Sequence, residues 1–154
     1  MPAESQPNTQ DCNCFAIRSA ARHVTQLYDQ FLAPVGLRAT QFSILARLRR
    51  MGPMTINALA EQMVTDRTTI GRNVQPLQRE GLIRIEASAA DRRAKELHLT
   101  KAGEKRLQDA LGAWSQAQTR FESSFGAERA AELRTMLRAV AANPLTPSAQ
   151  FADH

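Results

Sequence analysis

The spacing of apolar residues changes along this chain of 154 residues, and the change limits the folds that it can adopt. Before Gly81, apolar residues recur every three or four positions, which is the spacing of amphipathic helices. After Gly81 they alternate with polar residues, first around Ile83 and then around Leu97, which is the spacing of strands. Helical spacing returns after Thr100. The sequence therefore predicts a mostly α (α+β) fold in which one β-hairpin interrupts a series of helices.

Four helices are expected before the hairpin and two after it. Proline and glycine end the first two, at Pro34 and at Gly52-Pro53, and Gly126 separates the last two. Threonine or aspartate precedes four of the six, as helix N-caps usually do. The candidate N-caps are Thr40, Thr55, Thr65 or Asp66, and Thr100.

The fourth helix has one apolar face and one polar face. At about 100° per residue, Ile70, Val74 and Leu77 share a sector and form the buried face. The opposite face and its flanks carry small and hydrogen-bonding side chains, which match base edges in the DNA major groove. The candidate DNA contacts on this helix are Arg67, Thr68, Thr69, Arg72, Asn73 and Gln75.

Pro76 lies inside this helix, where its missing N–H removes one backbone hydrogen bond. We expect a kink or an early helix end at Pro76. Contacts from Thr68 to Asn73 precede it and should survive, whereas Gln75 and Arg79 become weaker candidates as base readers.

The loop of the predicted hairpin, residues 87–95, is exposed and basic. Its cations Arg92, Arg93 and Lys95 are candidate contacts to a minor groove or to the phosphate backbone. The formal net charge of the whole chain is +5, which permits binding to a polyanion without requiring it. A short helix, a brief turn, a capped polar helix and a basic hairpin, in this order, predict a winged helix-turn-helix.

Several motifs in this segment resemble the MarR family of bacterial regulators, and the similarity extends from about Cys14 to Ala142. The most specific resembles the family's wing signature, an Asp-x-Arg followed by Leu-Thr-x-x-Gly. Its residues are Asp91-Arg92-Arg93-Ala94-Lys95, Leu97, Leu99, Thr100, Ala102 and Gly103. Supporting matches are Thr40-Gln41-Phe42, Leu59-Ala60, Asp66-Arg67-Thr68-Thr69, Arg72, Leu77 and Gly81-Leu82.

The resemblance implies a homodimer whose N- and C-terminal helices form a dimerisation region and whose two winged lobes bind a pseudo-palindromic operator in double-stranded DNA. By position, Arg93 resembles the wing-tip arginine that enters the minor groove, Asp91 the acidic residue that fixes the wing, and Arg72 a recognition-helix arginine. We therefore expect a single domain. Its parts would be dimerisation helices at 12–34 and 101–142, a DNA-binding lobe at 38–100, and flexible tails at 1–11 and 143–154.

Family members are usually repressors that a phenolic or aromatic acid, or thiol oxidation, releases from DNA. Cys12 and Cys14 are candidate redox-sensing thiols at the start of the first helix, although an inert pair is the simpler interpretation. For an anionic effector held between this helix and the DNA-binding lobe, the candidate contacts are Arg18, Arg22 and His23. These three also fit a solvated helix face.

Other classes of protein have less support in the sequence. No apolar stretch is long enough to span a bilayer and no secretory leader is visible, so we expect a cytoplasmic protein without a membrane partner. The cysteines and histidines lack a metal-ligand spacing, and no catalytic or cofactor motif is evident, so we expect no metal, no cofactor and no enzyme. Two alternatives remain, a winged-helix module for protein contacts and a thiol-redox enzyme using Cys12 and Cys14.

Overall fold

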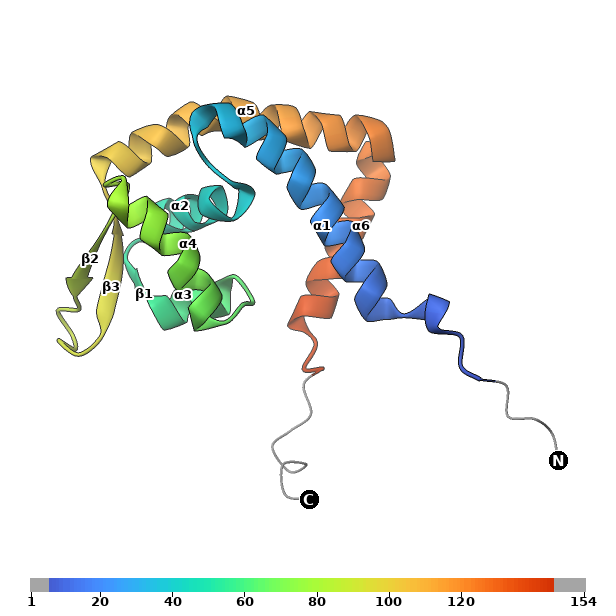
Figure 1. The fold of residues 1–154 in the computed structure, drawn as a ribbon, viewed down its shortest axis with the longest axis horizontal. Coiled ribbons are helices and arrows are strands. Elements are labelled where there is room, and N and C mark those ends of the chain that lie inside the picture. Colours follow the sequence, from blue (N-terminus) through green and yellow to red (C-terminus); the bar gives the residue numbers. More distant parts are fainter. Residues whose placement is uncertain (1–5, 146–154) are drawn as a thin grey trace, which may run out of the picture.

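The computed structural model describes residues 6–145, so the outer parts of both predicted tails, 1–5 and 146–154, lie outside it. The elements in chain order are η1 (Thr9–Asp11), α1 (Asn13–Leu32), η2 (Ala33–Val35), α2 (Ala39–Met51), β1 (Met54–Thr55), α3 (Ile56–Gln62), α4 (Arg67–Arg79), β2 (Ile83–Ala87), β3 (Lys95–Leu99), α5 (Lys101–Phe125) and α6 (Ala127–Ala142). Figure 1 shows a lobe of α2, α3, α4 and the sheet at one end of the long helix α5, with α6 folding back from the other end. The predicted winged helix-turn-helix is present.

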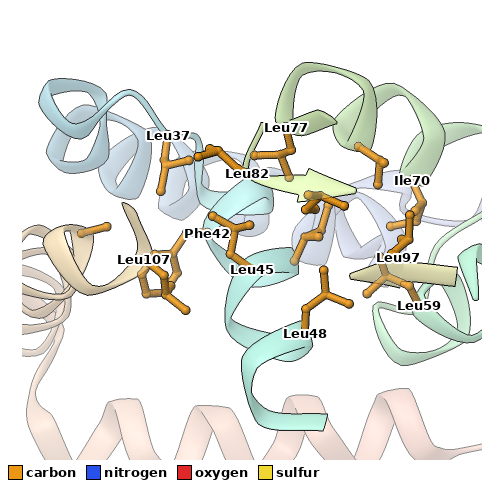
Figure 2. Close-up of a cluster of buried hydrophobic side chains, with 14 of the residues drawn as sticks. Leu37, Phe42, Leu45, Leu48, Leu59, Ile70, Leu77, Leu82, Leu97 and Leu107 are labelled. Atoms are coloured by element: carbon orange, nitrogen blue, oxygen red, sulfur yellow. The ribbon is translucent and has the colours of Figure 1, made fainter. Parts of the chain in front are cut away.

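One hydrophobic core holds this lobe together (Figure 2). The face of α4 predicted to be buried is buried, and Ile70 and Leu77 are fully enclosed. Leu45 of α2 and Leu107 of α5 belong to the same core, so the DNA-binding lobe and the first turns of α5 share one packed interior. The core therefore fixes α4 relative to α5.

The sheet has three antiparallel strands in the order β1-β3-β2, one more than the hairpin predicted from the sequence. Leu97 of β3 lies opposite Ile85 on one side and Met54 of β1 on the other. Strand β1 is only two residues long, so it has no alternation that a sequence pattern could reveal. It joins the start of α3 to the base of the wing.

Three of the predicted N-caps are confirmed. The side chains of Thr55, Asp66 and Thr100 each accept a hydrogen bond from the backbone N–H three residues later. The prediction of Thr40 as the cap of the second helix is wrong, because α2 begins at Ala39. Asp29 of α1 instead accepts the Ala39 N–H, at 2.7 Å. This carboxylate from another helix adds to the local hydrogen bond in which the Arg38 N–H donates to Gln41 Oε1 at 3.0 Å.

Pro76 does not end α4, and the expectation of an early helix end is wrong. The helix continues from Arg67 through Pro76 to Arg79. Val74 and Leu77, on either side of the proline, are both buried in the core. Their packing holds both segments of the helix in place despite the missing backbone hydrogen bond.

A close backbone contact joins the end of α4 to the start of α5. The hydroxyl of Thr100 donates to the carbonyl of Gly81 at 2.6 Å, and its N–H donates to the carbonyl of Leu82 at 3.2 Å. Gly103, in the first turn of α5, lies so near Leu82 that an added Cβ would sit 2.1 Å from the Leu82 carbonyl oxygen. Only glycine fits at this position.

We predict that Gly103→Ala lowers the free energy of unfolding by at least about 2 kcal/mol, because the methyl group displaces backbone rather than a flexible side chain. The matched control is Gly112→Ala in the same helix, where an added Cβ meets nothing within 4 Å. That variant should gain roughly 0.5–1 kcal/mol from helix propensity. Urea unfolding at one protein concentration measures both. Equal effects of the two substitutions would contradict the proposed close contact.

Candidate nucleic-acid interface

The first turn of α4 is held by Asp66. Its Oδ1 accepts the backbone N–H of Thr69 at 2.8 Å, and its Oδ2 accepts the Thr69 hydroxyl at 2.8 Å. These hydrogen bonds hold the pKa of the Asp66 carboxyl below its ordinary value. The carboxylate therefore remains charged at neutral pH and caps the helix end that carries the predicted DNA contacts.

The predicted contact residues on α4 do not all present free side chains. Thr68, Arg72 and Gln75 are exposed on the face opposite the core, as the helical periodicity predicts. The Thr69 hydroxyl is engaged by Asp66, and the side-chain amide of Asn73 donates to the Thr69 carbonyl at 2.9 Å. The side chains of Thr69 and Asn73 therefore stabilise the helix. Each would have to break this internal hydrogen bond before it could bond to a DNA base.

The wing loop is a defined turn rather than a loose tip. Asp91 Oδ1 accepts the N–H of Arg93 at 3.0 Å, and the Asp91 carbonyl accepts the N–H of Ala94 at 3.0 Å. The buried Ser88 closes the loop from the other side, because its N–H donates to the Ala94 carbonyl at 2.8 Å. The carboxylate of Asp91 thus fixes the turn that presents Arg93 to solvent.

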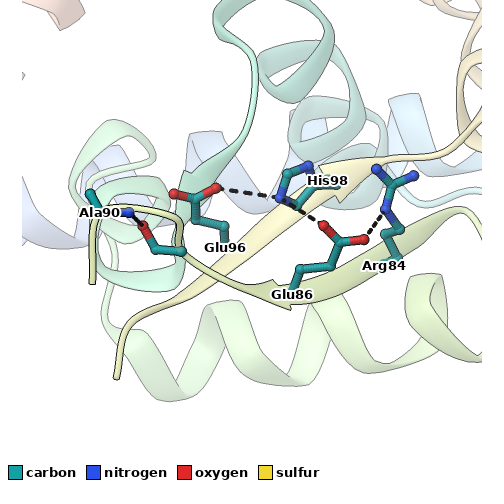
Figure 3. Close-up of polar contacts among 6 residues, drawn as sticks. Arg84, Glu86, Ala90, Glu96 and His98 are labelled. Atoms are coloured by element: carbon teal, nitrogen blue, oxygen red, sulfur yellow. Dashed lines mark hydrogen bonds and ion pairs between the residues drawn. The ribbon is translucent and has the colours of Figure 1, made fainter. Parts of the chain in front are cut away.

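Charges on the strands of the wing are paired with one another (Figure 3). Arg84 Nε lies 2.6 Å from Glu86 Oε1, and His98 Nε2 lies 3.3 Å from Glu96 Oε2 and 3.7 Å from Glu86 Oε2. These side chains therefore satisfy each other on one face of the hairpin. Among the residues that the structure describes, Arg92, Arg93 and Lys95 have no such partners.

Within residues 6–145, no carboxylate lies within 4.0 Å of the cationic atoms of the five predicted DNA-contacting cations on α4 and the wing. These cations are Arg67, Arg72, Arg92, Arg93 and Lys95. All five are exposed. Arg67, Arg93 and Lys95 also line one common hollow between the wing and the helix-turn-helix. Cations without ion-pair partners suit the phosphates of duplex DNA. The exposed polar face of α4 beside them suits the hydrogen-bonding base edges in its grooves.

Known proteins with this sequence pattern and fold are transcriptional regulators. The sequence model of the MarR family matches residues 37–95. The M. tuberculosis transcriptional regulator MosR, solved in complex with DNA, is 36% identical, with a TM-score of 0.72 over 84% of this chain and 96% of that one. The chain belongs to the MarR family. It is a DNA-binding transcriptional regulator and not an enzyme, as the sequence predicted.

Two curated relatives of this MarR-family chain come from Bacillus subtilis. One is the uncharacterized HTH-type transcriptional regulator YwoH, which is 30% identical over 93 residues, covering 60% of this chain and 67% of the relative. The other is the organic hydroperoxide resistance transcriptional regulator, which is 26% identical over 90 residues, covering 58% of this chain and 61% of the relative. The aligned segments thus span about two thirds of the length of these relatives.

The candidate sensor residues lie on α1, away from the wing. Cys12 and Cys14 are exposed free cysteines, and Cys12 Sγ accepts the N–H of Phe15 at 3.4 Å as the N-cap of α1. His23 lines a hollow of about 440 Å³ between α1 and the end of α5, whereas Arg18 and Arg22 do not line it. The residues lining this hollow come from α1 and α5 only, whereas the sequence predicted an effector between the first helix and the DNA-binding lobe.

The structure adds two residues to the interface that sequence reasoning missed. Thr55 and Asn57 line the same hollow as the wing cations. In the sequence, Thr55 appears only as a helix cap and Asn57 only as a residue in the first turn of a short helix. Neither pattern indicates DNA contact. Only the pairing of β1 with β3 places them beside Lys95.

No helix within residues 6–145 is long and apolar enough to cross a membrane. Across the same residues, no three histidine, cysteine, aspartate or glutamate side chains are placed to hold a metal ion.

Proposed function

We propose that this MarR-family regulator binds a pseudo-palindromic operator as a homodimer and represses transcription, acting in the cytoplasm beside the chromosome. The observation that carries the proposal is the set of uncompensated cations on one lobe, next to the exposed face of α4. In this arrangement α4 enters the major groove, and the wing reaches the adjacent minor groove. Thr68, Arg72 and Gln75 face the base edges.

Arg93 is the proposed minor-groove residue of the wing. It is exposed, it is not ion-paired within residues 6–145, and the turn fixed by Asp91 presents it. A narrow minor groove has an enhanced negative potential, which favours an inserted arginine. Gln75 remains a candidate base reader, because α4 stays helical to Arg79.

We predict that Arg93→Ala weakens operator binding by about five- to 150-fold, which corresponds to roughly 1–3 kcal/mol for a lost groove contact. Fluorescence anisotropy with the duplex that the protein selects from a random library measures the loss. Arg120→Ala, which removes an exposed arginine from α5, is the control and should change little. Wild-type binding should weaken steeply with salt. A wild-type protein that binds no DNA at low salt would favour a protein-interaction module instead.

The proposed dimer rests on apolar side chains that a single chain leaves exposed on its N- and C-terminal helices. On α1, Phe15 is 72% exposed and Ile17 43% exposed. On α6, Met136 is 59% exposed, and Leu137 and Val140 are also exposed. Exposed apolar clusters of this kind mark interfaces between proteins. A second copy of the chain would cover both helices and set the distance between the two lobes.

We predict that Leu137→Glu raises the dimer dissociation constant by on the order of a hundredfold, because an unpaired carboxylate would be buried in the interface. Sedimentation velocity across a concentration series measures the shift. The control, Arg138→Gln, changes the neighbouring exposed residue without adding an acidic group. A Leu137→Glu protein that sediments as wild type does would rule α6 out of the interface.

We further propose that thiol oxidation at Cys12 and Cys14 releases the repressor. Both thiols are exposed, and the B. subtilis relative named for organic hydroperoxide resistance suggests a peroxide as the oxidant. A peroxide converts one thiol to a sulfenic acid and leaves as an alcohol. The second thiol then displaces water and forms a disulfide. Because Cys12 caps α1, either product changes the start of a dimerisation helix.

We predict that organic peroxide lowers operator affinity of the wild-type protein, that dithiothreitol restores it, and that Cys12→Ser combined with Cys14→Ser abolishes this response. Anisotropy before and after peroxide treatment measures it. Unchanged peroxide sensitivity of the double variant would remove the redox proposal. In that case a small aromatic acid becomes the favoured effector, and the hollow lined by His23, Phe121 and Phe125 is where we would place it.

A further inference from the structure

We infer that a cluster of polar side chains at the corner between α5 and α6 sets the half-site spacing at which the dimer binds its operator. This corner cluster consists of Tyr28 from α1, Gln118 and Glu122 from α5, and Arg134 from α6. The inference rests on the proposed binding of an operator by a homodimer. Such dimers read two half-sites at a separation that their own geometry fixes.

The chain turns sharply at Gly126, where α5 ends and α6 folds back (Figure 1). The φ angle of Gly126 is +102°, a conformation that residues with side chains rarely adopt. Just beyond the turn, Ala130 is buried, and the guanidinium of Arg129 lies 4.3 Å from the centre of the Phe125 ring. Because these contacts lie so close to the turn, they constrain the direction of α6 only weakly.

The corner cluster holds α6 farther from the turn. Arg134 Nη1 lies 3.5 Å from Glu122 Oε1, and Arg134 lies about two helical turns beyond Gly126. Within residues 6–145, this is the only side-chain hydrogen bond or ion pair that joins α6 to another element. It therefore resists a swing of α6 with a longer lever arm than the packing of Ala130 does.

Tyr28 connects the same cluster to α1. Its hydroxyl donates a hydrogen bond to Oε1 of Gln118. Burial raises the pKa of Tyr28, the charge of Glu122 raises it further, and the charge of Arg134 lowers it. Both charged side chains therefore lie near the tyrosine. Helices α1, α5 and α6 thus meet at one polar cluster.

A small rotation of α6 at its start produces a large displacement at its far end. Val140, one of the exposed apolar residues of the proposed dimer interface, follows Gly126 by about 14 residues, or roughly 21 Å along the helix. A rotation of about 10° at the turn would move Val140 by about 4 Å. Successive base pairs are about 3.4 Å apart. Such a rotation would therefore shift the second lobe by about one base pair.

No single contact of the corner cluster fixes this angle alone. Arg134 and Glu122 are partly exposed, and ion pairs of that kind contribute little to stability. The hydrogen bond of Tyr28 is partly buried and adds a constraint from a third helix. The cluster must therefore be tested by removing both contacts together.

The experiment compares operators whose half-sites differ only in their spacing. The duplex that the protein selects from a random library is remade with one base pair inserted or deleted between the half-sites, and fluorescence anisotropy measures each dissociation constant. Wild type should bind the altered duplexes about a hundredfold more weakly than the original. Tyr28→Phe combined with Arg134→Gln should reduce this ratio to about tenfold, because the two lobes are no longer held at one separation. The affinity for a single half-site should stay unchanged.

Two variants serve as controls. Arg138→Gln makes the same change one turn farther along α6, at an arginine without an ion pair within residues 6–145, and should keep the wild-type ratio. Arg134→Lys alone retains the positive charge opposite Glu122 and should keep most of that ratio. Circular dichroism and sedimentation velocity establish whether each variant is a folded dimer.

A double variant that is a folded dimer and keeps the wild-type ratio would overturn the role of the corner cluster and leave the proposed operator binding standing. A monomeric double variant would overturn it too, because the cluster would then hold the dimer together rather than set its spacing. An equal loss of discrimination in Arg138→Gln would have the same consequence. A wild-type protein that is monomeric, or that binds every spacing equally, would overturn the proposed dimeric binding as well.

Discussion

The approach of Gly103 to the backbone of Leu82 is the contact on which the rest of the structure depends. It joins the end of the recognition helix, the last residue of the wing and the start of α5 within a few ångströms. Thr100 adds two hydrogen bonds to the same turn, one to Gly81 and one to Leu82. A change in the direction of α5 must therefore be transmitted to both DNA-reading elements. Packed contacts of this kind are one route by which proteins couple distant sites.

The distribution of charge follows from the same arrangement. On the strands of the wing, Arg84 lies beside Glu86 on β2 and His98 lies beside Glu96 on β3, and His98 also approaches Glu86 across the hairpin. The arginines of the loop and of the N-terminal half of α4 are exposed, and none is ion-paired within residues 6–145. The exposed cations thus lie at the two elements that are proposed to reach the grooves, while the sheet behind them contributes rigidity.

The sequence predicted those features that depend on residues close together in the chain. The caps at Thr55, Asp66 and Thr100 involve partners three residues away, and the buried face of α4 follows from helical periodicity alone. The features it missed depend on distant residues. Asp29 caps α2 from ten positions earlier, and β1 exists only because β3 passes beside it. Pro76 does not end α4 for the same reason, since residues packed in the core lie on both sides of it.

The same distinction applies to the DNA-binding site. Local motifs identified Arg67, Arg93 and Lys95 one by one, but only the fold places them around a common hollow with Asn57. In the proposed dimer, the spacing between the two lobes would depend on contacts between chains through the exposed apolar side chains of α1 and α6. Of the features proposed to give specificity for an operator, the helix face and the wing motif can be predicted from the sequence, whereas the spacing of two lobes depends on a second chain.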